Sequence, residues 1–201
     1  MPNRYLVFNK PYGVMSQFSG SDVTRTLRHY IQVKRVYPVG RLDQDSEGLL
    51  LLTDDGELQH RLTNPKFAHP RTYWAQVERI PDENALRRLR AGVAIQNYRT
   101  LPAHLKLLDE ERRVPPRDPP IRFRKNVPTA WLEITLVEGR NRQLRRMTAA
   151  IGHPTLRLIR VAIGDLWLQE LRLEPGEWRE LSSSELKALR ENVKSENVKS
   201  N

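Results

Sequence analysis

The chain has 201 residues and a formal net charge of +10, from 34 Lys and Arg against 24 Asp and Glu, and it contains no cysteine. This length is enough for one domain, or two small ones, with a buried core. The missing cysteines exclude disulfides, thiolate catalysis and cysteine metal sites, and no apolar run approaches the ~20 residues of a membrane span. No signal-peptide segment follows the start, so we expect a cytoplasmic protein. The positive charge favours a polyanionic partner, and nucleic acid is the first candidate.

The first third of the chain predicts short strands and two short helices. The expected strands lie at residues 5–8, 14–18 and 49–53, and the expected helices at residues 24–33 and 57–64. A turn at residues 9–13 ends the first strand. The third strand is a continuous apolar run, which is typical of burial on both faces. Asp54, Asp55 and Gly56 indicate a hairpin-like turn before the second helix, which stops before Pro65.

Strands and helices alternate over the rest of the chain. The expected strands lie at residues 71–80, 131–138, 156–164 and within 166–173, and the expected helices at residues 82–91, 141–152 and 182–190. Asp82 or Asn84 can cap the first of these helices, and Gly92 can end it. Ser182 and Glu185 have the spacing of a capping box, which predicts the start of the last helix.

Two segments lack the pattern of a packed element. Residues 109–128 are rich in Pro and charge, and we expect an irregular surface loop there. Residues 191–201 repeat a polar five-residue unit, and we expect a disordered tail. The order of the other elements, with short connections, predicts an α+β fold in which helices pack on a mixed sheet.

An acidic stretch interrupts the basic chain at residues 40–58, GRLDQDSEGLLLLTDDGEL. It holds one arginine against six carboxylates, a net of −5, so the rest of the chain carries +15. From the residues alone, Asp43 is best explained as a turn or cap residue before a strand, between glycines that allow a tight bend. Asp45 and Glu47 are expected to hydrogen-bond the turn or to pair with Arg41, and the acids at 54 and 55 belong to the hairpin-like turn.

An arginine-rich stretch lies at residues 138–146. On a helix that begins near Asn141, Leu144, Met147 and Ile151 would form the buried face. Arg142 and Arg146 would then be i, i+4 neighbours on the solvent side, where a solvated helix face and phosphate contact are equally good explanations. Arg145 would lie between core and solvent, where its head group can reach a cleft while its stem packs.

Six motifs occur in one order along the chain: FNKPYGVMSQ, VGRLDQDSEGLLLLTDDG, RTYWAQV, EGRNRQLRRM, GHPTLRLIRVAIG and PGEWREL. Together they make the chain resemble the ribosomal RNA pseudouridine synthases of the RsuA family, from about residue 5 to residue 189. The wording LRLIRVAIG, and the absence of the N-terminal S4 RNA-binding domain usual in that family, make it most like the RluE branch, which acts on large-subunit (23S) ribosomal RNA. Arg71 departs from the lysine that the family often has before the tyrosine.

The resemblance implies a fold and three catalytic residues. The fold would be a mixed, mainly antiparallel central sheet flanked by helices, with a cleft across the sheet. One catalytic domain would span residues 1–190, with two lobes that divide near residues 64–70. Asp43 would be the catalytic carboxylate, Tyr73 the aromatic residue that lines the base pocket, and Arg145 the basic partner of Asp43. Otherwise Tyr73 would be an ordinary residue on the core face of its strand.

The same resemblance implies an isomerase that uses no cofactor and no metal. Asp43 could act as a nucleophile or as a base that abstracts a sugar proton, and the sequence leaves both open. The target uridine must leave its helix or loop, which phosphate contacts can offset. The candidates for these contacts are Lys10, Arg41, Arg140, Arg142, Arg146 and Arg160. The alternative function is a catalytically silent RNA-binding or ribosome-assembly protein, and in both cases we expect a monomer.

Overall fold

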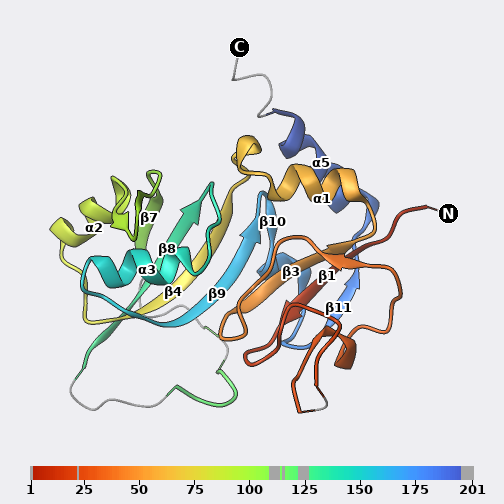
Figure 1. Ribbon diagram of the computed structural model, residues 1–201, viewed down its shortest axis with the longest axis horizontal. Helices are drawn as coiled ribbons and strands as arrows, with labels where there is room; N and C mark the ends of the chain where they lie inside the picture. Colours follow the sequence, from red (N-terminus) through yellow and green to blue (C-terminus); the bar gives the residue numbers. More distant parts are fainter. Residues whose placement is uncertain (1, 22, 109–113, 115, 122–126, 196–201) are drawn as a thin grey trace. The chain divides into compact units, whose positions relative to one another are not determined.

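The structure is a computed structural model that describes residues 2–21, 23–108, 114, 116–121 and 127–195 (Figure 1). The chain divides into two compact units. Unit 1 contains residues 1–69 and 160–201, and unit 2 contains residues 70–159. Strand β9 (Thr155–Ile163) begins in unit 2 and ends in unit 1. Among the described residues, no helix has the length and apolar character needed to cross a bilayer.

Unit 1 is a sheet with helices on it, drawn in red, orange and blue in Figure 1. Its strands are β1 (Tyr5–Lys10), β2 (Tyr37–Pro38), β3 (Glu47–Thr53), β10 (Leu166–Trp167) and β11 (Trp178–Glu180). Its helices are α1 (Gly56–Thr63), α4 (Leu168–Leu171) and α5 (Ser183–Ser195), with 3-10 turns η1 (Leu27–His29) and η2 (Pro65–Phe67). The strand order is β11-β1-β3-β9, and β1 runs antiparallel to both β11 and β3.

The core of unit 1 follows directly from its apolar runs. Every residue of β3 is buried, which confirms the expectation drawn from its continuous apolar sequence. One side of the sheet is covered by apolar residues of α1, α4 and α5, and α1 and α5 lie side by side in Figure 1. Asp55 caps α1 by accepting the Leu58 N–H at 3.0 Å, so Asp55 is a helix cap and not part of a hairpin-like turn.

Unit 2 carries further strands of the sheet, with two helices on one face of them, drawn in yellow to cyan in Figure 1. Its strands are β4 (Arg71–Glu78), β7 (His104–Leu108) and β8 (Thr129–Leu136), with a small hairpin of β5 (Ala94–Ile95) and β6 (Tyr98–Arg99). Its helices are α2 (Glu83–Arg90) and α3 (Gln143–Ala150). Strand β8 pairs antiparallel with β4 and with β7. The apolar faces of α2 and α3 pack on the buried face of β4 and β8.

Several local expectations are confirmed. Asp82 caps α2 by accepting the Ala85 N–H at 2.7 Å, and Gly92 follows its end with φ +81°. The capping box of α5 is formed: the Glu185 N–H donates to Ser182 Oγ at 3.3 Å, and the Ser182 N–H donates to Glu185 Oε2 at 2.8 Å. The α+β class with a mainly antiparallel sheet flanked by helices is confirmed as well.

Other expectations are wrong. The helix expected at residues 24–33 is only the turn η1, because Thr26 is extended and pairs with Met15 in an isolated parallel bridge. That bridge is also all that forms of the strand expected at residues 14–18. Helix α5 continues to Ser195, so residues 191–195 are helical and not part of a disordered tail. The rest of that tail and most of the expected loop at 109–128 lie outside the described residues.

Candidate active-site residues

Asp43 stands in a tight turn whose backbone is fixed from two sides. The Ser46 N–H donates to the Asp43 carbonyl at 3.0 Å, which closes the turn just before β3. The preceding Leu42 is buried, and its backbone exchanges two hydrogen bonds with Ser16 Oγ, at 2.8 and 3.1 Å. Gly40, with φ +66°, makes the bend before this segment. The Asp43 side chain is half-buried, and Ser16, which follows β1, holds the backbone next to it in place.

Lys10, at the end of β1, is a cation that interacts electrostatically with this carboxylate. Its side chain is 0% exposed, and Nζ donates to the carbonyls of Val14 at 2.6 Å and Pro11 at 3.1 Å. Burial lowers the pKa of Lys10 to about 8, although the charges of Glu47, Asp45 and Asp43 act to raise it. The acidic stretch therefore supplies the negative charge around a buried amine in unit 1.

Arg160, in the unit 1 part of β9, is a second buried cation. It is 3% exposed, and Nε donates to the Leu49 carbonyl of β3 at 2.7 Å. Its charge acts against that of Lys10, since it contributes to lowering the pKa of that amine. The sequence predicts phosphate contacts for Lys10 and Arg160, and in the structure both side chains are buried and hydrogen-bonded to main-chain carbonyls.

The other charges of the acidic stretch have separate roles. Arg41 is exposed, and within the described part of the chain it forms no ion pair, so the expected pairing with Asp45 or Glu47 is wrong. Glu47 is instead buried at the start of β3. Asp54 is exposed and accepts the Arg4 N–H at 2.7 Å. Arg41 is thus an exposed cation, as a contact with phosphate requires.

Tyr73 lies on β4 of unit 2, opposite Ile134 of β8. Its half-buried side chain packs against the apolar core of unit 2. The neighbouring Trp74 faces the other side, where Nε1–H donates to Glu133 Oε2 at 2.9 Å. This hydrogen bond explains how an aromatic residue can occupy the otherwise polar face of the strand.

Arg145 lies on α3, also in unit 2. Leu144, Met147 and Ile151 are buried, as the periodicity predicted, and Arg145 is half-buried beside them. Its Nη1 donates to the Thr155 carbonyl at 3.4 Å. The structure thus places Tyr73 and Arg145 in unit 2 and Asp43 in unit 1.

The remaining arginines surround the start of α3. Arg140 stacks on the Tyr98 ring at 4.0 Å from its centroid, a cation–π contact. Arg146 donates to Gln96 Oε1 at 2.5 Å and to Asn141 Oδ1 at 3.0 Å. Arg142 precedes the helix with φ +50°, so the helix begins at residue 143. The sequence predicts Arg142 inside the helix, and the structure places it just before the helix, where its carbonyl accepts the Arg146 N–H at 3.1 Å.

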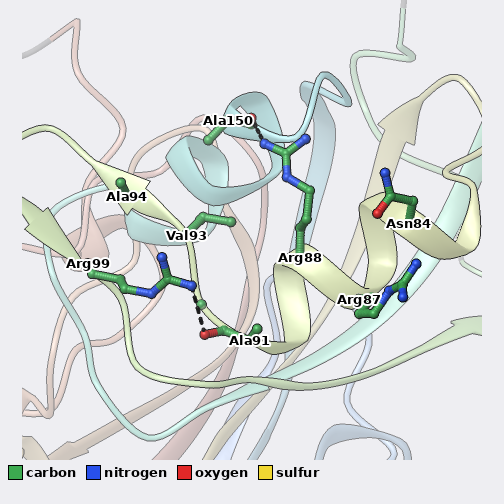
Figure 2. A pocket seen from close by; sticks show the side chains of 9 residues that line it. Asn84, Arg87, Arg88, Ala91, Val93, Ala94, Arg99 and Ala150 are labelled. Atoms are coloured by element: carbon green, nitrogen blue, oxygen red, sulfur yellow. Dashed lines mark hydrogen bonds between the residues drawn. The ribbon is translucent and has the colours of Figure 1, made fainter.

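One group of basic residues was not singled out from the sequence. A pocket of about 590 Å³ in unit 2 is lined by Arg87, Arg88 and Arg99, with Asn84 and several small residues (Figure 2). The adjacent arginines of α2 at positions 87 and 88, outside its apolar stripe, were the available signal. The partner from β6 is brought in only by the fold. Within the described residues, no group of three His, Asp or Glu side chains is arranged to hold a metal ion.

Comparison with known proteins gives a consistent result. Residues 4–150 match the family model described as RNA pseudouridylate synthase. A ribosomal large subunit pseudouridine synthase E of Vibrio parahaemolyticus is 53% identical over 178 residues, which cover 89% of this chain and 74% of the relative. A protein of the same name from Xanthomonas axonopodis pv. citri is 56% identical over 168 residues, covering 83% and 88%. A crystal structure of a pseudouridylate synthase superposes with a TM-score of 0.77 at 32% identity, covering 94% of this chain and 74% of that one.

Proposed function

Because the chain belongs to the RNA pseudouridylate synthase family, we propose that it isomerises a specific uridine of large-subunit (23S) ribosomal RNA to pseudouridine, with Asp43 as the catalytic carboxylate. The named substrate of its relatives supports the choice of RNA. The proposal includes a monomeric enzyme that works in the cytoplasm on free RNA or on an assembling subunit. The excess of +15 outside the acidic stretch provides attraction for the RNA backbone.

The observation that carries the role of Asp43 is its environment in unit 1. The turn fixes the backbone of Asp43, and the buried amine of Lys10 lies within its electrostatic reach. A nearby positive charge favours the ionised form of a carboxylate. Both roles left open for Asp43, attack on the substrate or abstraction of a sugar proton, require that ionised form. The fixed turn and the buried amine therefore fit a carboxylate that is presented for chemistry.

The reaction balances without any other reagent. The bond between C1′ of the ribose and N1 of the uracil breaks, and a bond between C1′ and C5 forms. The proton on C5 is lost, and N1 gains a proton, so no electron or water molecule is consumed. We assign Tyr73 to stacking on the displaced base and Arg145 to holding the Asp43 carboxylate. The exposed Arg41, with the arginines near the start of α3, would hold the RNA while the uridine leaves its stack.

The deciding experiment replaces Asp43 by Asn, which keeps the shape and removes the charge. The substrate is ribosomal RNA from a strain that lacks the gene, and the readouts are pseudouridine formation and RNA affinity. We expect Asp43→Asn to lose activity by roughly a thousandfold or more, while the affinity stays within a few-fold. Asp54→Asn is the matched control, since Asp54 is an exposed acid of the same stretch, and this variant should stay active.

A catalytically silent RNA-binding protein on the same scaffold is the alternative. Three carboxylates grouped around Lys10 argue against it, because simple binding has no use for charges that repel phosphates. This alternative would be correct if the wild-type protein bound the RNA but formed no pseudouridine in it. An active Asp43→Asn variant would instead show that another residue performs the chemistry.

A further inference from the structure

The pocket of about 590 Å³ in unit 2 has a basic rim. Arg87 and Arg88 come from the exposed side of α2, and Arg99 comes from β6 (Figure 2). Among the residues that line it, all of them described, there is no carboxylate. The acid closest in sequence, Glu83, is engaged by Arg90, whose Nη1 lies 2.5 Å from Glu83 Oε1. Three positive charges therefore share one hollow without a negative partner in its lining.

The floor of the pocket is built from small residues. Ala91, Gly92, Ala94 and Ala150 line it together with Val93. Ala94 is the direct cross-strand partner of Arg99 in the β5–β6 hairpin, so the two side chains lie on the same face. The alanine methyl group leaves the space beside the arginine unfilled. The pocket thus exists because small residues occupy the β5–β6 hairpin and the C-terminal ends of α2 and α3.

Two of the guanidinium groups are held at helix ends. Arg88 Nη2 donates to the Ala150 carbonyl at the end of α3, at 3.4 Å, and Arg99 Nη2 donates to the Ala91 carbonyl at the end of α2, at 3.5 Å (Figure 2). Arginine side chains commonly complete helix C-termini in this way. Each of these long bonds uses one of the five N–H donors of a guanidinium. Arg87 makes no such bond within the described part of the chain.

We infer that this pocket is a docking site for the phosphate backbone of the RNA substrate, separate from the residues assigned to catalysis. The inference rests on the proposed function only for the identity of the RNA. Arginine suits this task because its planar fork can bind two phosphate oxygens at once. A polyanion with regular charge spacing can contact several of the three arginines along one strand. Phosphate contacts of this kind hold and orient the RNA without reading its sequence.

The test uses the full chain with Arg87→Gln, Arg88→Gln and Arg99→Gln combined. RNA affinity is measured across a salt series with a protein-free ribosomal RNA fragment. Each arginine that neutralises a phosphate contributes about 0.7 to 0.9 to the slope of log K against log salt. We expect the slope of the pocket variant to be smaller by about 2 and its affinity at low salt to fall more than tenfold. KM should rise, and kcat at saturating RNA should stay within about twofold of the wild-type value.

The matched control removes the same charge elsewhere. Arg4, Arg61 and Lys187 are each engaged by an exposed carboxylate, and their combined replacement by Gln also lowers the formal net charge by three. A slope equal to that of this control would overturn the inference. Replacing the three pocket arginines by Lys keeps the charge, so it should restore the slope. A Lys variant with the slope of the Gln variant would show that the loss does not come from the charge, which would refute phosphate contact. The proposed function is judged separately, by whether the wild-type protein forms pseudouridine.

Discussion

Replacing Lys10 by Met tests whether Lys10 is a buried, titrating amine. Lys10 is 0% exposed, and burial lowers its pKa from 10.5 to about 8. A methionine has nearly the same volume but no charge, so it fits the same space. The total stability of Lys10→Met is not informative, because removing the amine also removes a positive charge that acts on Glu47. The change of stability with pH is informative, because methionine does not titrate.

The sign follows from the two pKa values. Between about pH 8 and pH 10.5 the unfolded chain binds the proton of Lys10 more strongly than the folded chain, so the free energy of unfolding rises with pH in this window. The stabilisation is complete above pH 10.5 and is lost as the pH falls through 8. The separation of the two values corresponds to about 3 kcal/mol. Over the accessible range from pH 7 to pH 9, the expected increase is about 1 kcal/mol.

The assay is urea-induced unfolding at pH 7 and pH 9 for the wild-type protein and for Lys10→Met. The quantity compared is the increase in the free energy of unfolding between the two pH values. We expect this increase to be about 1 kcal/mol larger in the wild-type protein than in the variant. Lys66→Met is the control, since Lys66 is exposed on η2, and its increase should match the wild-type value. Equal increases in all three proteins would refute the view that Lys10 is a buried, titrating amine.

Two further predictions concern groups outside the candidate site. Glu185→Gln should lower the free energy of unfolding by about 1 kcal/mol at pH 7, a value limited by solvent exposure of its ion pair with Arg179. The hydrogen bond from Arg179 lowers the pKa of Glu185 to about 2, so this stabilisation is present above about pH 4.5 and should vanish in unfolding curves as the pH falls towards 2. Tyr98→Phe should keep the stability or raise it by up to about 1 kcal/mol, because the buried Tyr98 hydroxyl has no hydrogen-bond partner within the described residues; a clear loss in urea unfolding would contradict this.

The features that the sequence predicted correctly are those set by neighbours along the chain. The caps at Asp82 and Ser182 act on backbone groups three residues away, and the buried strand β3 is a single apolar run. In each case the interacting residues lie close together in the sequence, so the sequence shows both partners. The helix expected at residues 24–33 failed because Thr26 pairs with Met15, a contact that helical periodicity cannot reveal.

The burial of Lys10 could not be predicted for the same reason. Lysine is almost never fully buried, and the charges that accompany Lys10 come from residues more than thirty positions away in the chain. A lysine next to a predicted turn is therefore expected to be exposed to solvent. The arginine pocket has a similar origin, since Arg99 reaches it only through the pairing of β5 with β6. The order of the motifs was enough to predict the family. Which basic residues are buried and which are exposed became clear only from the fold.

The separation of the basic residues into buried and exposed ones explains why a basic protein contains an acidic stretch. Asp43, Asp45 and Glu47 act electrostatically on the buried Lys10, and Arg160 adds a second buried positive charge. Three negative charges with two positive ones leave the group close to neutral, so it repels a phosphate backbone less than the carboxylates alone would. Buried charges are screened little by salt, whereas the attraction between exposed arginines and RNA is largely screened beyond the Debye length of about 8 Å at physiological salt. Different residues therefore serve the two tasks: buried cations accompany the carboxylates of the acidic stretch, and exposed arginines attract the RNA.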